Sequence, residues 1–178
     1  MKYSSPKLNA GFSLVEMLVV IALIGILGAI AAPSWISFLN RQRLNSAQAE
    51  ALSVIRQAQV NAKAEKRIWQ ASFRNSNGKI QWAVHPENVS VDNVNWNNLL
   101  GEDADKIDIE DTNTTLRKEN DIYHVQFQYK GRVNGQLGKV TFILPSLRNR
   151  ENAPRSCVWV STLLGALRTD RNSGCLGN

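Results

Sequence analysis

A single acid inside a long apolar run is the feature of this sequence with the clearest chemistry. Residues 14–32 are all apolar or glycine except Glu16, in a chain of 178 residues. A helix of that length, at about 1.5 Å per residue, just crosses a hydrocarbon core of roughly 30 Å. A carboxylate at the centre of such a helix costs roughly 3 kcal/mol, and an intramembrane acid is by default a functional group that needs a partner. We therefore expect a membrane helix in which Glu16 is a functional residue that needs a partner.

A cleaved secretory signal is the alternative explanation of the run. Lys2 and Lys7 supply a basic start, and Ala29-Ile30-Ala31 resembles a cleavage site. The run is longer than the usual signal core of about 7–15 apolar residues, and a signal gains nothing from Glu16. Basic residues flank both ends of the run, so its orientation does not follow from charge.

The residues that lead into the run are Lys7-Leu-Asn-Ala-Gly11-Phe12-Ser-Leu-Val-Glu16. They resemble the cleavage and methylation segment of type IV pilins and type II secretion pseudopilins, in which a short basic leader, Gly, Phe and a later Glu precede an apolar helix. The resemblance implies a leader over residues 1–11, removed between Gly11 and Phe12 by a prepilin peptidase, and N-methylation of Phe12. It also implies that Glu16 meets the N-terminal amine of a neighbouring subunit, because a neutralised pair is tolerated in lipid where single charges are not.

The same resemblance implies a function and a location. We expect a structural minor pilin or pseudopilin, anchored by one pass in the inner membrane with its head in the periplasm. Its partners are then the prepilin peptidase and the other pilins or pseudopilins of a type IV pilus-like or type II secretion filament. His85 and His124 are isolated within strand patterns, and no nucleophile, metal-ligand spacing or phosphate loop stands out. We therefore expect no enzyme, no cofactor and no metal.

One long helix is predicted to carry these residues. A transmembrane or filament-core part is expected over residues 12–35, kinked at Pro33, where a backbone hydrogen bond is lost. An amphipathic part is expected over residues 36–70, because no Gly or Pro interrupts residues 34–70. Its apolar stripe comprises Leu39, Leu44, Ala47, Ala51, Ile55, Ala58 and Ala62. Its opposite, polar side comprises Arg41, Arg43, Gln48, Arg56, Gln59, Lys63 and Lys66.

A β-rich globular head is predicted over residues 71–178. The apolar residues recur at every second position in residues 80–84, 123–129, 140–144 and 158–160, which predicts strands there. One helix followed by several close strands favours an α+β fold with an antiparallel sheet packed on the helix. Residues 87–121 contain ten acids and three basic residues, and we expect a solvated surface loop there. The overall content of 43% apolar and 20% charged residues excludes a disordered or collagen-like chain.

The head carries a second, weaker resemblance. Phe127-Gln-Tyr-Lys-Gly131-Arg132-Val, residues 140–144, and Val158-Trp-Val-Ser-Thr-Leu-Leu-Gly165-Ala-Leu-Arg168-Thr are similar to the GspH/FimT group of minor pilins. That group has a Gly-Arg turn after one strand and ends in a strand that leads to a Gly-Arg-x-Arg turn.

Export of such a head would take Cys157 and Cys175 into an oxidising compartment. An even pair of cysteines there favours a disulfide over two free thiols.

DNA binding is the alternative function. The formal net charge is +6, and residues 132–178 hold seven basic residues and two acids. Some FimT-like minor pilins are DNA receptors in natural transformation and use the terminal turn, which would place Arg168 and Arg171 at the contact. Here that turn reads Gly165-Ala166-Leu167-Arg168, so its first arginine is missing. A solvated basic surface therefore explains the charge better than DNA binding does.

Overall fold

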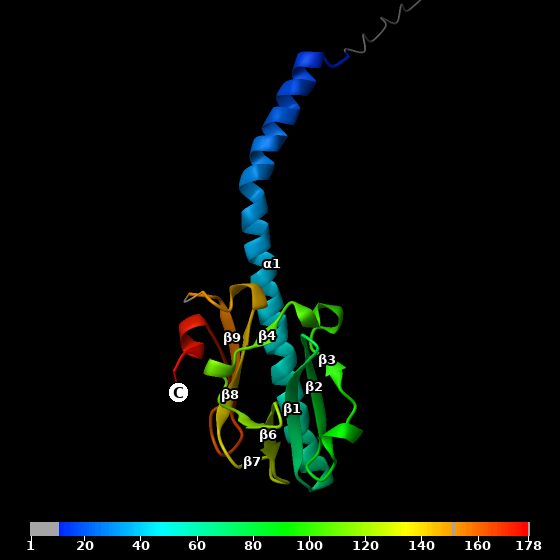
Figure 1. Ribbon diagram of the computed structural model, residues 1–178, viewed down its shortest axis with the longest axis vertical. Helices are drawn as coiled ribbons and strands as arrows, with labels where there is room; N and C mark the ends of the chain where they lie inside the picture. Colours follow the sequence, from blue (N-terminus) through cyan, green and yellow to red (C-terminus); the bar gives the residue numbers. More distant parts are fainter. Residues whose placement is uncertain (1–10, 151, 178) are drawn as a thin grey trace, which may run out of the picture. The chain divides into compact units, whose positions relative to one another are not determined.

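The computed structural model describes residues 11–150 and 152–177, apart from the side chains of residues 31–33. Most of the predicted leader, residues 1–10, therefore lies outside the described residues. The chain divides into two compact units, residues 1–39 and residues 40–178. Helix α1 (Leu14–Glu65) contributes to both units, and the second unit, the head, adds two antiparallel sheets (Figure 1).

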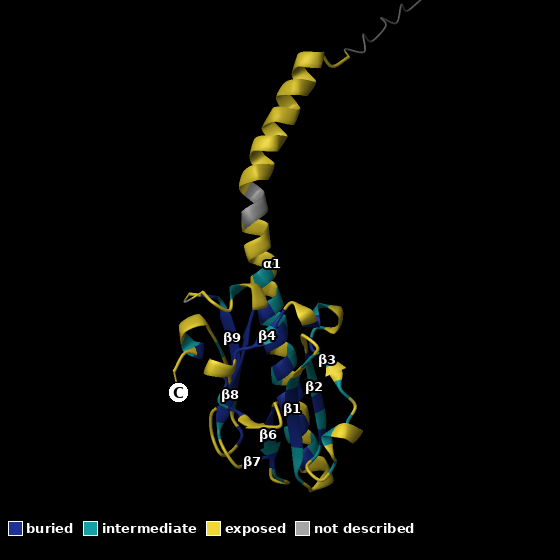
Figure 2. Ribbon diagram, in the orientation of Figure 1, coloured by how far each residue is buried: buried dark blue, intermediate teal, exposed yellow. Residues whose placement is uncertain are grey.

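The first unit is apolar and exposed. All side chains described between residues 11 and 30 are exposed (Figure 2). Among the described residues, α1 is the one helix long and apolar enough to cross a membrane. An apolar helix with no buried face in its own chain requires lipid or other helices around it.

The C-terminal half of α1 belongs to the head and forms the centre of its core. The predicted stripe is buried from Leu44 onward, with Val54 added, whereas Leu39 is 36% exposed. Four alanines in this stripe, at positions 47, 51, 58 and 62, have no exposed surface. Small side chains let the sheets approach the helix closely, which explains why the stripe is alanine-rich.

The helix ends earlier than its predicted end at residue 70. Its last residue is Glu65, and Lys66 has a left-handed φ of 53°. Strand β1 (Trp69–Ser76) then begins, with Trp69 paired to Phe127 and to Pro86 on its two sides. No Gly or Pro marks this helix end in the sequence, because Lys66 occupies the left-handed position at which glycine usually follows a helix.

Sheet A has the strand order β3-β2-β1-β6-β5, with β7 on the far end of β6. Its other strands are β2 (Lys79–Pro86), β3 (Asn97–Asn98), β5 (Arg117–Glu119), β6 (Ile122–Phe127) and β7 (Val133–Asn134). Asn77 and Gly78 both have positive φ and close the β1–β2 hairpin as an Asn-Gly turn.

Sheet B has the strand order β10-β9-β8-β4. Its strands are β4 (Asp108–Ile109), β8 (Gly138–Ile143), β9 (Arg155–Val160) and β10 (Leu167–Arg171). Phe73 of sheet A and Phe142 of sheet B meet edge to face at 6.5 Å, so the two sheets share one core with α1. The predicted α+β fold, a long helix packed on antiparallel sheet, is confirmed, and the four predicted strands correspond to β2, β6, β8 and β9.

The acidic segment is more ordered than the predicted surface loop. Within residues 87–121 the structure forms β3, β4, β5 and the 3₁₀ turns η1 (Val91–Asn93), η2 (Gly101–Asp105) and η3 (Asp111–Asn113). Leu99, Ile107, Ile109 and Leu116 from this segment are buried in the core. These apolar residues are spaced singly among the acids, so the net charge of the segment concealed them.

Candidate functional site

The start of α1 brings the predicted processing residues together. Gly11, Phe12 and Ser13 precede the helix without regular structure, and Phe12 is 78% exposed. Ser13 Oγ accepts a hydrogen bond from the backbone N–H of Glu16 at 3.2 Å. Ser13 and Glu16 thus form the Ser-x-x-Glu pattern that caps helices. This cap is a signal that our sequence analysis overlooked.

Glu16 lies in the first helical turn, where its carboxylate faces the positive end of the helix dipole. Within the described part of the chain, no basic group lies at ion-pair distance from this carboxylate. The structure does not describe the side chain of Pro33, so the kink predicted there stays a prediction.

The disulfide between Cys157 and Cys175 is confirmed, with 5.7 Å between the two Cα atoms. It joins β9 to the 3₁₀ turn η5 (Asn172–Cys175), and both cysteines are fully buried. Gln48 of α1 reinforces the same place, because its Nε2 donates to the carbonyls of Cys157 at 2.9 Å and Asp170 at 2.6 Å. The prediction that Gln48 lies on the polar side opposite the apolar stripe was wrong: the residue is only 6% exposed, and its amide donates to two backbone carbonyls instead of to water.

A second glutamine of α1 holds the two glycine turns singled out in the sequence. Gln59 Nε2 donates to the carbonyls of Gly131 at 2.9 Å and Gly165 at 3.1 Å. Gly131 and Gly165 have φ of 74° and 81°. A Cβ at position 165 would lie 2.3 Å from Gln59 Nε2 and 2.6 Å from the Gly131 carbonyl oxygen. Both glycines are therefore required by backbone conformation, and Gly165 also by close approach.

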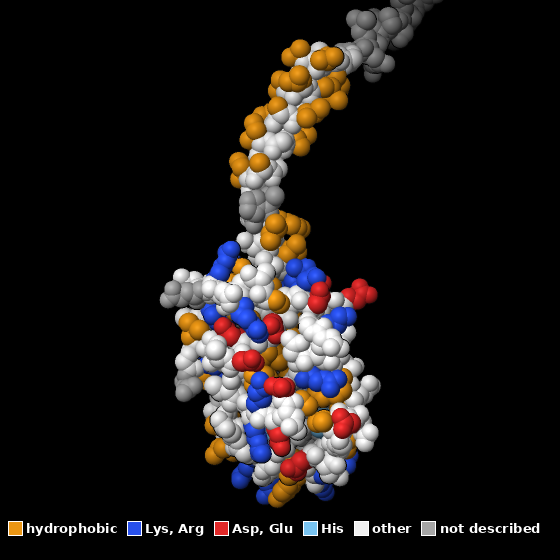
Figure 3. Space-filling view, viewed as in Figure 1, with side chains coloured by type: hydrophobic (Ala, Val, Ile, Leu, Met, Phe, Trp, Pro, Cys, Tyr) orange, Lys and Arg blue, Asp and Glu red, His pale blue; other side chains and the backbone are white. Residues whose placement is uncertain are grey.

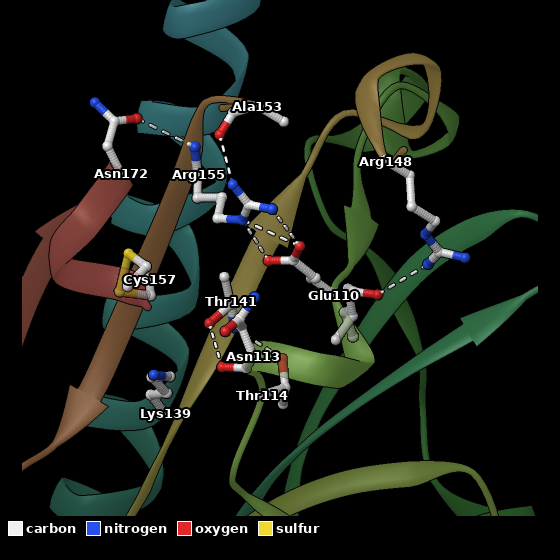
Figure 4. Close-up of polar contacts among 12 residues, drawn as sticks. Glu110, Asn113, Thr114, Lys139, Thr141, Arg148, Ala153, Arg155, Cys157 and Asn172 are labelled. Carbon is white, nitrogen blue, oxygen red and sulfur yellow. Dashed lines mark hydrogen bonds and ion pairs between the residues drawn. A yellow bond between two sulfur atoms is a disulfide. The ribbon is translucent and has the colours of Figure 1, made fainter. Parts of the chain in front are cut away.

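A buried ion pair attaches the acidic segment to sheet B. Arg155 Nε lies 2.8 Å from one oxygen of Glu110 and 3.0 Å from the other, and Arg155 also donates to the Ala153 carbonyl (Figure 4). Burial alone would raise the pKa of Glu110, but the hydrogen bonds from Arg155 and Asn113 outweigh it and lower that pKa. The hydrogen bond to Glu110 in turn raises the pKa of Arg155. Both groups are therefore charged, and this basic residue of the C-terminal segment is occupied internally.

The two candidate DNA contacts lie in a strand and not in a turn. Arg168 and Arg171 are in β10, and the turn itself ends before them at Ala166. Arg168 stacks over Trp159, with its guanidinium carbon 4.6 Å from the ring centroid, and lies 3.7 Å from Asp170. Arg171 is exposed. The structure thus separates the glycine turn from the arginines that were expected to extend it.

Part of the basic charge of residues 132–178 is buried or paired within the head. Lys139 is fully buried, lies over Trp159 at 4.3 Å and donates to the Gly177 carbonyl. Arg148 pairs with Asp108 at 2.6 Å. Together with the Arg155–Glu110 pair, these contacts occupy three of the seven cations. The count of basic residues therefore overstates the positive surface.

His85 and His124 lie on the outer face of sheet A. His85 Nδ1 is 2.9 Å from the Pro86 carbonyl, and its Nε2 is 3.1 Å from Gln70 Nε2 and 3.2 Å from Ser72 Oγ. Burial lowers the pKa of both histidines. His124 also lines an open polar cleft of about 400 Å³ between sheet A and residues 87–91. In the described residues no group of three or more His, Cys, Asp or Glu is arranged to hold a metal ion.

Comparison with known proteins supports the N-terminal part of this description. Residues 6–32 match the family model described as the prokaryotic N-terminal methylation motif. A search of curated proteins gave no significant match. The resemblance predicted from Gly11, Phe12 and Glu16 is thus confirmed for the N-terminal segment.

Two crystal structures of the type IV minor pilin FimU from Pseudomonas aeruginosa, strain PAO1, are similar to this chain. The crystal form in space group P21 has 16% sequence identity and a TM-score of 0.49, over 75% of this chain and 92% of that chain. The form in space group P65 has 13% identity and a TM-score of 0.45, over 71% of this chain and 92% of that chain.

Proposed function

We propose that the chain is a structural minor pilin or pseudopilin subunit, processed between Gly11 and Phe12 and methylated at Phe12. The observation that carries the proposal is the position of Glu16. It is an acid in the first turn of an exposed apolar helix, within the segment, residues 6–32, that matches the methylation motif. On this proposal the helix anchors the precursor in the inner membrane, with the head in the periplasm, and later packs among the helices of a filament.

Assembly would use charge neutralisation at the helix terminus. Cleavage after Gly11 frees an amine at Phe12, four residues before Glu16. An amine and a carboxylate on separate helices each carry a desolvation penalty in lipid, and pairing between neighbouring subunits removes much of it. Glu16 would thereby favour entry into the filament and set the axial register between adjacent helices.

The test must separate the assembly role of Glu16 from its role at the helix start. Glu16→Gln keeps a side chain suited to the capping pattern and removes the charge. Ser13→Ala removes the cap and keeps the carboxylate. We expect Glu16→Gln to insert in the membrane normally but to be missing from sheared filaments, and Ser13→Ala to be incorporated. Normal incorporation of Glu16→Gln would refute the proposed pairing.

A DNA-receptor minor pilin is the alternative, and the head gives it less support. Three of the seven basic residues in residues 132–178 are buried or paired within the head, and Arg168 is stacked on Trp159. If the head bound DNA through β10, Arg168→Ala with Arg171→Ala would abolish a salt-sensitive DNA mobility shift. The choice between a type IV pilus and a secretion pseudopilus depends on the filament that incorporates the chain, which cross-linking to neighbouring subunits in cells would identify.

A further inference from the structure

Two turns at one end of the head present apolar side chains where turns are usually polar. The Gly165 N–H donates to the Thr162 carbonyl at 2.8 Å, which places Leu163 and Leu164 at the two central positions of a turn. The Gly131 N–H donates to the Gln128 carbonyl at 2.7 Å, which places Tyr129 and Lys130 in the same positions of a second turn. Turn centres are dominated by Gly, Pro, Asn, Asp and Ser, each for a conformational reason. Leucines and a tyrosine there have no such reason.

These side chains point into solvent. Leu163 is 62% exposed, Leu164 71%, Tyr129 51%, and Val60 on the adjacent turn of α1 59%. Scattered single apolar residues on a surface need no explanation, but a contiguous group does. The two turns lie side by side, because Gln59 binds both and because the Val133 N–H donates to the Leu163 carbonyl at 2.9 Å, and Val60 follows Gln59 on α1.

Basic residues surround this group. Lys63 lies against Gly131, since a Cβ there would be 2.0 Å from Lys63 Cε. Lys63, Lys130 and Arg132 are exposed, and among the described residues no carboxylate pairs with any of them. We call Val60, Lys63, Tyr129, Lys130, Arg132, Leu163 and Leu164 the two-turn tip. Basic and apolar side chains, with acidic ones among them, lie at the lower end of the head (Figure 3).

We propose that the two-turn tip binds the surface of an anionic lipid bilayer. Protruding leucines and a tyrosine enter the boundary between headgroups and acyl chains, while the surrounding lysines and arginine contact lipid phosphates. The Gln59 hydrogen bonds hold both turns in place before binding, so little ordering is needed on contact. This role belongs to the head's own surface and does not depend on filament assembly.

A protein partner fits this surface less well. A specific protein interface takes roughly 20–30 residues from each side, whereas the tip offers seven. Its apolar side chains protrude instead of lining a groove, and a fluid bilayer accommodates such side chains without a matching pocket. Basic side chains that are not ion-paired within the described head match anionic headgroups. Each cation near such a surface contributes roughly a fivefold gain in binding.

The experiment uses the full chain, with its apolar helix held in nanodiscs of phosphatidylcholine. Fluorescent vesicles of phosphatidylcholine, with or without phosphatidylglycerol, are added and floated on a density gradient. We expect the nanodiscs to float with the phosphatidylglycerol vesicles only, and the binding to weaken as salt rises. Lys130→Glu with Arg132→Glu is expected to reduce binding by more than about tenfold, and Leu163→Ser with Leu164→Ser to abolish it.

A matched control distinguishes the tip from the total charge. Lys79→Glu with Arg150→Glu makes the same change in net charge at exposed residues outside the tip and should leave binding unchanged. Equal binding to neutral vesicles, no binding at all, or equal loss in the control would overturn the proposal. Pairing of nanodiscs through the tip without vesicles would also overturn it, in favour of a contact between two copies of the chain.

Discussion

Gln59 and Gly165, 106 residues apart in the chain, are joined by a hydrogen bond of 3.1 Å from the glutamine amide to the glycine carbonyl. The same amide reaches Gly131, so one side chain of α1 holds the turns that follow strands β6 and β9 against the helix. This contact gives a structural reason for two short glycine motifs that are far apart in sequence.

Gln59→Ala should destabilise the head. It would leave the carbonyls of Gly131 and Gly165 without their shared donor, at a cost of about 1–3 kcal/mol. Gln57→Ala is the matched control, because Gln57 is exposed on the same helix. Thermal unfolding of the full chain in detergent measures both. Equal melting temperatures for the two variants would mean that water replaces the Gln59 contact without loss.

Gly165→Ala should destabilise the head more than Gly135→Ala does. Both glycines have positive φ, of 81° and 106°, so both variants bear backbone strain of about 1–2 kcal/mol. A Cβ at Gly135 meets open space, whereas one at Gly165 meets Gln59 and the Gly131 carbonyl. The difference between the two unfolding free energies in urea isolates this close approach. A zero difference would show that the turn shifts away freely.

Removing the disulfide should cost the head about 3 kcal/mol, the chain-entropy value for a loop of 18 residues. Cys157→Ser with Cys175→Ser tests this by chemical denaturation, without any reductant. Gln48 would still tie α1 to the Cys157 and Asp170 carbonyls, so we expect β10 to stay attached and the fold to persist. Complete loss of folding in the variant would mean that the disulfide, and not Gln48, holds this edge of sheet B.

Acid should destabilise the head first through its buried histidines. Burial lowers the pKa of His85 and His124 below the ordinary 6.5, so the unfolded chain binds protons more readily. The two neutral histidines contribute fully to the stability of the head above pH 6.5. This stability is lost as the pH falls from 6.5 through the pKa values of the histidines in the folded head. Protonation of His85 would also make its Nε2 a hydrogen-bond donor. This nitrogen lies 3.1 Å from Gln70 Nε2, which is itself a donor, so two donors would face each other. The stability that the charged Glu110 contributes is lost only as the pH falls below the ordinary carboxyl pKa of 4.5.

The measurement is the melting temperature between pH 8 and pH 5, with pH as the only variable. We expect a decline that begins near pH 6.5 and that is flattened in His85→Gln with His124→Gln. A decline that is equally steep in the double variant would exclude the histidines as its cause.

The sequence predicted those elements whose signal is local. The apolar run with Glu16 indicated the exposed helix, and the alanine stripe predicted the buried face of α1 from Leu44 onward. The cysteine pair was predicted only after the resemblance supplied an oxidising compartment. Periodicity could not assign roles to Gln48 and Gln59, because a helical pattern treats every glutamine as solvent-facing. Their partners are backbone carbonyls more than 70 residues away, which no local pattern encodes.

Charge counting failed for a related reason. Arg155 and Lys139 contribute to the net charge of the C-terminal segment as much as Arg132 does, yet the first two are buried. Only the fold determines which cations remain available to a partner. The same fold places the turn that holds Lys130 beside the turn that holds Leu163, although neither turn sequence nor the count of basic residues suggested a shared surface.

Intact-mass analysis of the protein extracted from its native membrane tests the central claim most directly. The account predicts a chain that begins at Phe12, carries one added methyl group and lacks two hydrogens through the Cys157–Cys175 bond. A chain that still begins at Met1, or one cleaved after Ala31 as a secretory signal would be, would contradict it.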